Sequence, residues 1–230
     1  MRGRRTRAAV ALMLASAAVW GASAPAADPA RVEICFNYGC ASRAAVGFEP
    51  ATLDAVRDAL AAAPSASAER EALARALGLM YREAGMQTPV AADRAGNFLD
   101  QEVEGRMDCI DHSTSTTRLL QLLEARGWLR FHRVVEPARR VRVLFQHFSA
   151  VIEEVEAPPP VAVEIPDHVP LLLALCDCAD VADDIPRPPP PPPGRPGERY
   201  AIDSWFVDNG EPAVVLPLAD WLDGEGPNVH

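Results

Sequence analysis

Apolar residues recur every three or four positions in two segments near the start of the chain, residues 48–64 and residues 65–85. This spacing places them on one face of an α-helix, and we expect each stripe to face a core. Pro50 suits the first turn of the first helix, and serines precede the second helix where a cap is needed. The first stripe consists of Leu53, Val56 and Leu60, and the second of Leu73, Leu77, Met80 and Tyr81.

A third helix is predicted within the stretch GRMDCIDHSTSTTRLLQLLEARGWL, residues 105–129. Asp108 is its natural N-cap, because the carboxylate can accept an unpaired amide of the first turn. Cys109 is therefore expected in the first turn, and Gly127 is placed to end the helix. The apolar positions that follow helical spacing are Leu119, Leu122 and Leu123.

The pattern then changes to an alternation of apolar and polar residues, which is typical of strands. It runs through residues 129–136 and 141–156, and it returns in residues 199–218 with Asn209-Gly210 as a hairpin turn signal. In the second segment one face carries Val141, Val143, Phe145, His147, Ser149 and Val151. A short helix is expected over residues 218–224. Helices followed by an antiparallel sheet predict an α+β fold.

Residues 157–198 interrupt this order. They include six consecutive prolines, Pro188 to Pro193, which form a polyproline spacer or a loop without regular structure. We interpret the segment as an insertion between two strands of the core. The expected organisation is a single domain over residues 27–230 that carries this proline-rich insertion.

Residues 1–26 have the pattern of an export signal: four arginines, a short apolar stretch, and small residues around a cleavage point near Ala26. The alternative is an uncleaved anchor, but the apolar stretch is short for a membrane span. We therefore expect a periplasmic or secreted protein with no stable membrane span after cleavage.

The chain has a net charge of −10, and all 22 of its basic residues are arginine. Cleavage at the expected point would leave 18 basic against 32 acidic residues. A chain this acidic should not bind nucleic acid or an anionic membrane surface through its charge. Without lysine it cannot serve as its own amine donor in side-chain cross-linking.

Five cysteines in an exported chain leave an odd one. Cys35 and Cys40 bracket FNYG, a turn-forming stretch that a small disulfide loop would close. Cys176 and Cys178 are too close in sequence for an easy mutual bridge. These four cysteines can pair in three ways, and the sequence does not choose among them. Cys109 is left as the lone thiol.

A thiol is a useful nucleophile only as thiolate, and the amides of a helix N-terminus stabilise that charge. A histidine within hydrogen-bond distance would take the thiol proton, and a carboxylate beyond it would orient the imidazole. The chain offers these parts in the order Cys109 at a helix start, His147 on one strand and Asp203 on another. Each has a plain structural alternative, so the three are credible only as a set.

These residues lie in blocks that resemble the transglutaminase-like branch of the papain-type cysteine enzymes. DCIDHSTSTTRLLQLLEARGWL is similar to the nucleophile helix of that superfamily, QHFSAVIEE to its histidine strand and YAIDSWF to its aspartate strand. The blocks also resemble an uncharacterised family of exported proteobacterial proteins. The resemblance implies a transglutaminase-like, papain-like core, in which the nucleophile helix packs on an antiparallel sheet.

By this resemblance Cys109 is the nucleophile, His147 the base and acid, and Asp203 the orienting residue. The superfamily usually has its histidine and aspartate strands close in sequence. The 56 residues between His147 and Asp203 therefore require the insertion described above.

Around this set, the amide of Cys109 is the natural donor for an oxyanion, and a side chain from the preceding segment, Gln101 or Asn97, is a candidate second donor. His112, Trp205 and Gln101 are candidates for the wall of the site, with a place directly behind that wall as the alternative for His112.

A metal site is the competing interpretation of the same stretch. It would use Asp108, Cys109, Asp111 and His112, with His132 as a further candidate. Asp108 and Asp111 have a simpler role as negative charges in a first helical turn, and no second Cys/His pair stands at zinc spacing. We expect no metal and no cofactor.

The function expected from the sequence is an exported cysteine hydrolase or acyltransferase that acts on an amide or ester through a thioester. A peptidase, an amidase and a transglutaminase-like enzyme all fit, and the partner would be a peptide or protein substrate, including cell-envelope material. The alternative is a non-catalytic envelope binding module that retains the transglutaminase-like fold.

Overall fold

The computed structural model describes residues 30–142, 145–157 and 193–227. They form a mixed helix and sheet arrangement with an antiparallel sheet, as the α+β prediction required. The expected signal at residues 1–26, most of the proline-rich insertion, and Cys176 and Cys178 lie outside the described residues. No helix in the described ranges is both long enough and apolar enough to cross a membrane.

Four antiparallel strands form the main sheet in the order β3-β4-β5-β6. Their bounds are His132–Arg142 for β3, Phe145–Glu154 for β4, Arg199–Asp203 for β5 and Val214–Pro217 for β6. β4 and β5 are neighbours in the sheet although the expected insertion separates them in sequence. Their register pairs Ala150 with Ile202 and Glu153 with Arg199.

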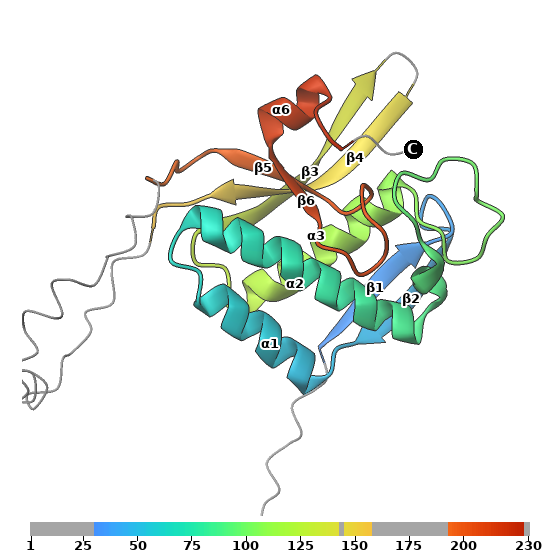
Figure 1. The fold of residues 1–230 in the computed structure, drawn as a ribbon, viewed down its shortest axis with the longest axis horizontal. Coiled ribbons are helices and arrows are strands. Elements are labelled where there is room, and N and C mark those ends of the chain that lie inside the picture. The colour runs from blue at the N-terminus through green and yellow to red at the C-terminus, as the bar shows by residue number, and fades with distance from the viewer. Residues whose placement is uncertain (1–29, 143–144, 158–192, 228–230) are drawn as a thin grey trace, which may run out of the picture.

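The helices follow the apolar stripes. Their bounds are Pro50–Ala61 for α1, Ala66–Gln87 for α2, Cys109–Ala125 for α3 and Leu218–Asp223 for α6, with a short 3-10 helix η1 over Pro89–Ala92. Ser65 caps α2 by accepting the amide of Ala68. Figure 1 shows α1 and α2 side by side on one side of the main sheet, with α6 on the other side.

The core lies between the sheet and the helices. One face of α3 and one face of the sheet meet in a single hydrophobic cluster, which includes Leu119, Leu120, Leu123, Ala150, Ile152 and Ile202. Several polar residues of α3 are buried too, and hydrogen bonds satisfy Ser115 and Thr116 among them. Ser115 accepts the amide of Cys35, and Thr116 bonds to Tyr81 and Ser204.

Two features differ from the sequence prediction. The expected strand over residues 141–156 is divided, because Val141 belongs to β3, where it pairs with Gln146, and β4 begins at Phe145. Val141 therefore does not continue the face of His147 along one strand. A further hairpin that the sequence pattern did not predict, β1 (Arg31–Phe36) and β2 (Ser42–Gly47), packs against α3.

Candidate functional site

The first turn of α3 carries the thiol. Asp108 is the N-cap, and its side chain accepts the amides of Ile110 and Asp111, while the Asp111 side chain accepts the amide of Asp108. This reciprocal capping box satisfies the free amides of the helix end and makes Cys109 the first helical residue. The expected position of Cys109 at the head of the helix is confirmed.

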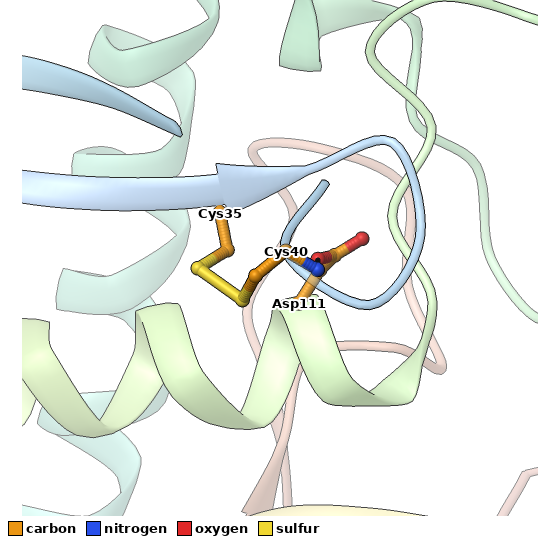
Figure 2. A group of neighbouring side chains, drawn as sticks. All are labelled: Cys35, Cys40 and Asp111. Atoms are coloured by element: carbon orange, nitrogen blue, oxygen red, sulfur yellow. Dashed lines mark hydrogen bonds between the residues drawn. A yellow bond between two sulfur atoms is a disulfide. The ribbon is translucent and has the colours of Figure 1, made fainter. Parts of the chain in front are cut away.

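A disulfide-closed turn holds the same two carboxylates from outside the helix. Cys35 and Cys40 form a disulfide, and the turn between β1 and β2 has positive φ at Asn37, Tyr38, Gly39 and Cys40. The amide of Gly39 donates to Asp108, and the amide of Cys40 donates to Asp111. Figure 2 shows the disulfide lying against the first turn of α3, with Asp111 directed at Cys40. The turn therefore fixes the end of the helix that bears Cys109.

The Cys109 thiol is partly buried against the backbone of β4. It donates to the carbonyl of Gln146 at 3.8 Å, and the amide of Phe148 acts on its sulfur. Burial, with a smaller contribution from the charges of Asp108 and Asp203, raises the pKa of Cys109 to about 11 against the lowering effect of the Phe148 amide. The thiol is thus protonated at neutral pH, and it needs a base to become a nucleophile.

His147 and Asp203 form the base and its partner. Nε2 of His147 lies 2.6 Å from Oδ2 of Asp203, with the imidazole partly buried and the carboxylate 2% exposed. Because a carboxylate only accepts, Nε2 carries the proton and Nδ1 is left with its lone pair. This is the tautomer that a general base needs.

Asp203 has two further donors. Nε1 of Trp221 donates to Oδ2 at 2.8 Å, and the amide of Trp205 donates to Oδ1 at 3.2 Å. A buried carboxylate requires such donors to stay ionised, and together they fix its orientation toward His147.

Aromatic rings enclose the imidazole of His147. The ring centroids of Trp205, Phe206 and Trp221 lie 4.8, 5.5 and 5.6 Å from that of His147. Cys109 packs against the same aromatic cluster. The expected place of Trp205 beside His147 is therefore found, although Trp205 follows the end of β5 and lies in a turn.

The structure thus brings Cys109, His147 and Asp203 to one place. The thiol contacts the backbone at the two residues that flank His147 on β4. Within the described ranges, the thiol makes no direct hydrogen bond to His147.

His112 and Gln101 were the other candidates for a place in or directly behind the wall of the site. His112 is 3% exposed, bonds to Ser204 at 2.9 Å and lies 3.0 Å from Asp93 at an angle outside hydrogen-bond geometry. Burial is the largest single effect and lowers the pKa of His112, but the nearby carboxylates of Asp93, Asp203 and Asp111 together outweigh it, so that the pKa is raised. His112 therefore helps to hold the residue after Asp203 in place through its hydrogen bond to Ser204. Gln101 is exposed in a turn of the segment before Cys109.

Donors for an oxyanion are limited. The Ile110 and Asp111 amides are taken by Asp108, whereas no acceptor binds the Cys109 amide among the described residues. The side-chain nitrogen of Asn97 donates to both oxygens of Asp100. The Cys109 amide is therefore the donor that this site offers.

The residues of the metal alternative are not brought together as a ligand set in the described ranges, where the one group with suitable spacing is Cys35, Cys40 and Asp111. The two sulfurs of that group are bonded to each other, so they are not thiolate ligands. His132 bonds to the buried Glu69, which also accepts the amides of Arg130 and Phe131. That cluster ties α2 to β3 and has a structural role.

Comparisons with protein families, with curated proteins and with solved structures find no match to this chain. The site is therefore interpreted from its own geometry.

Sequence reasoning missed the contact between Trp221 and Asp203. The signal was present in principle, because a buried indole needs an acceptor for its N–H. It also missed Arg140, which lies over the Trp221 ring at 4.6 Å and donates to the Trp221 carbonyl. Both contacts depend on the packing of α6 beside β5, which the local sequence pattern does not predict.

Proposed function

We propose that the protein is an exported cysteine hydrolase or acyltransferase with a transglutaminase-like core. The observation that carries the proposal is the pair of His147 and Asp203 at 2.6 Å, set beside a lone thiol at the start of α3. Histidine and aspartate on adjacent antiparallel strands, facing a cysteine at a helix N-terminus, are the parts that acyl transfer through a thioester requires.

In the proposed reaction Nδ1 of His147 takes the thiol proton as Sγ of Cys109 attacks the carbonyl carbon of an amide or ester. The Cys109 amide stabilises the oxyanion that forms. His147 then returns the proton to the leaving group, the bond to the leaving group breaks, and a thioester remains. Water or an amine attacks the thioester with His147 again as base, and the thiol is regenerated.

The Cys35–Cys40 disulfide supports the expected export, because such bonds persist in oxidising compartments. Periplasm and extracellular medium both satisfy this condition. The substrate would accordingly be a peptide or protein outside the cytoplasm, including cell-envelope material.

A non-catalytic binding module is the second candidate. It is favoured by the raised pKa of Cys109 and by the hydrogen bond of its thiol to a backbone carbonyl, because both stabilise the protonated thiol, which is a poor nucleophile. The two candidates differ in whether Cys109 becomes acylated.

Acylation by p-nitrophenyl acetate tests the proposal. Trypsin cleaves after arginine, so the peptide of residues 107–118 carries Cys109 as its one cysteine. We expect acetate on this peptide in the intact protein and not in Cys109→Ala, with release of p-nitrophenolate slowed at least about tenfold in His147→Ala. Adding glycinamide then shows whether an amine competes with water for the thioester. Release of p-nitrophenolate at the same rate in the intact protein and in Cys109→Ala would support the binding module instead.

A further inference from the structure

A pocket of about 160 Å³ opens beside His147. Its lining combines β3, β4, the turn after β5 and the segment before α3, and it includes Phe98, Arg140, Arg142, Phe145, His147 and Trp205. The volume is about five times the share of one water molecule in the liquid, so the pocket suits one side-chain-sized group.

The register of the β3–β4 hairpin places two arginines on the face of the imidazole. Arg140 is directly opposite His147, and Arg142 is directly opposite Phe145. Residues opposite each other in an antiparallel pair project from the same face of the sheet. Both guanidinium groups therefore lie on the side of the sheet where the proposed reaction takes place.

These two cations lack full compensation by nearby carboxylates. In the part of the chain that the structure describes, neither forms a salt bridge: Arg140 donates to the carbonyls of Trp221 and Glu225, and Arg142 to that of Asp223. The negative charge of Asp203 stabilises the charged form of Arg140, but the Asp203 carboxylate is already hydrogen-bonded to His147 and Trp221.

Among the residues that the structure describes, none that lines the pocket is acidic, although the chain as a whole has a net charge of −10. Burial, together with the neighbouring charge of Arg142, lowers the pKa of Arg140, as expected where positive charges gather. The pocket is thus a positive site on an acidic protein, and it would attract an anion.

The rest of the lining consists of Gln146, Gly224 and three aromatic side chains, and two of the aromatic rings are open to solvent. Phe98 is 60% exposed and Phe145 is 74% exposed, and Phe98 packs edge-on against Trp205 at 4.9 Å. Exposed rings next to guanidinium groups suit a ligand with a short aliphatic part and an anionic end.

We propose that this pocket binds a short acyl side chain that ends in a carboxylate, so that the substrates are amides or esters with an acidic group close to the scissile carbonyl. The inference rests on the proposed function, because it assumes that the acyl group is delivered to Cys109. Arg142, together with Arg140, is the specificity-determining element.

Two alkylating agents of nearly equal shape test the charge preference. Iodoacetate carries a carboxylate where iodoacetamide carries an amide, and in both reactions Sγ of Cys109 displaces iodide from the methylene carbon while the thiol proton passes to a base. We expect Arg142→Gln to lower the ratio of the iodoacetate rate to the iodoacetamide rate roughly fivefold at low salt, because it removes one partly exposed charge. Glutarate should slow labelling of Cys109 by iodoacetamide, and its neutral diamide should not.

Arg139→Gln is the matched control. Arg139 is an exposed arginine of the same strand that bonds to the Gln146 side chain and does not line the pocket. Its substitution should leave the ratio and the glutarate protection unchanged. Arg140→Gln also removes contacts to the Trp221 and Glu225 carbonyls, so Arg142→Gln with an unchanged melting temperature is the decisive variant.

The inference is overturned if Arg142→Gln and Arg139→Gln give the same ratio, or if glutarate gives no protection. Either result leaves the proposed function intact as long as labelling of Cys109 depends on His147. Labelling that is independent of His147 would instead remove the proposed function, while the rate ratio would still report whether the pocket prefers anions.

Discussion

At the scale of single residues, Asp203 connects the parts of the site. It accepts from His147 and Trp221 through one oxygen and from the Trp205 amide through the other. The sequence predicted that a carboxylate in an apolar strand must have a partner, and it named His147. It gave no indication of Trp221, because that donor comes from a separate helix whose packing the local pattern does not encode.

Asp203→Asn should therefore cost stability as well as chemistry. The neutral amide accepts more weakly than a carboxylate, and it leaves at least one of the three N–H donors to Asp203 poorly satisfied, so we expect a loss of about 1–3 kcal/mol in the free energy of unfolding. Urea denaturation measures it. Asp208→Asn is the control, because Asp208 accepts the Ala95 amide at an exposed position. Equal losses in the two variants would argue against a special role for Asp203.

At the scale of elements, the head of α3 is built from two sides. The capping residues were visible in the sequence, since Asp108 precedes an amphipathic run. The left-handed turn of residues 37–40 that grips Asp108 and Asp111 was not, because four consecutive positive φ values have no simple sequence signature and Gly39 is the only glycine among them. The FNYG stretch signalled a turn, but not its contact with a helix about 70 residues later.

The contacts of the turn of residues 37–40 with Asp108 and Asp111, called the clamp below, are sensitive to pH because Asp111 titrates. Burial, and then the charge of Asp108, raises the pKa of Asp111 to about 6 from its usual 3.8. Because the folded-state pKa is the higher one, the stabilising contribution is full below about pH 4 and is lost as the pH rises through 6. Relative to Asp111→Asn, the natural protein should lose up to about 3 kcal/mol of stability between pH 4 and pH 7.

Unfolding free energies of both proteins across that range measure the effect. Asp58→Asn, at an exposed position of α1, should show no such trend against the natural protein. The account would be contradicted if the unfolding free energy of the natural protein, minus that of Asp111→Asn, stayed constant or increased as the pH rises.

Strand boundaries were harder to predict than the strands themselves. The segment predicted as one strand, residues 141–156, runs across the turn between β3 and β4, and residues 142–145 contain no glycine, proline or asparagine to mark that turn. The pattern was therefore interpreted as one strand over residues 141–156. The face of His147 was still predicted correctly relative to Ser149 and Val151, because all three lie on β4.

At the scale of the whole molecule, the sheet closes across the expected insertion. The amide of Glu154 donates to the Glu198 carbonyl, and the amide of Gly197 donates to the Glu154 carbonyl, both at 2.8 Å. The two ends of the segment between β4 and β5 are thus held together by the sheet itself. The change of composition in residues 157–198 predicted an insertion here, whereas strand order follows from pairing that only the structure shows.

Replacing residues 160–190 by a short Gly-Ser linker should therefore preserve the fold. We expect a melting temperature within a few degrees of the natural protein, since shortening a loop whose ends are already paired changes the closure entropy only slightly. Thermal unfolding followed by circular dichroism measures it. A drop of more than about 10 °C, or failure to fold, would show that the segment contributes to the core.

The central claim is that His147 activates Cys109, and the rate of iodoacetamide labelling at pH 7 tests it most directly. The label is read on the tryptic peptide of residues 107–118. With the pKa of Cys109 raised to about 11, the thiol alone is almost entirely protonated, so rapid labelling requires a base. The account predicts labelling of the natural protein that slows at least about tenfold in His147→Ala and is absent in Cys109→Ala. Equal labelling rates in the natural protein and His147→Ala would contradict it.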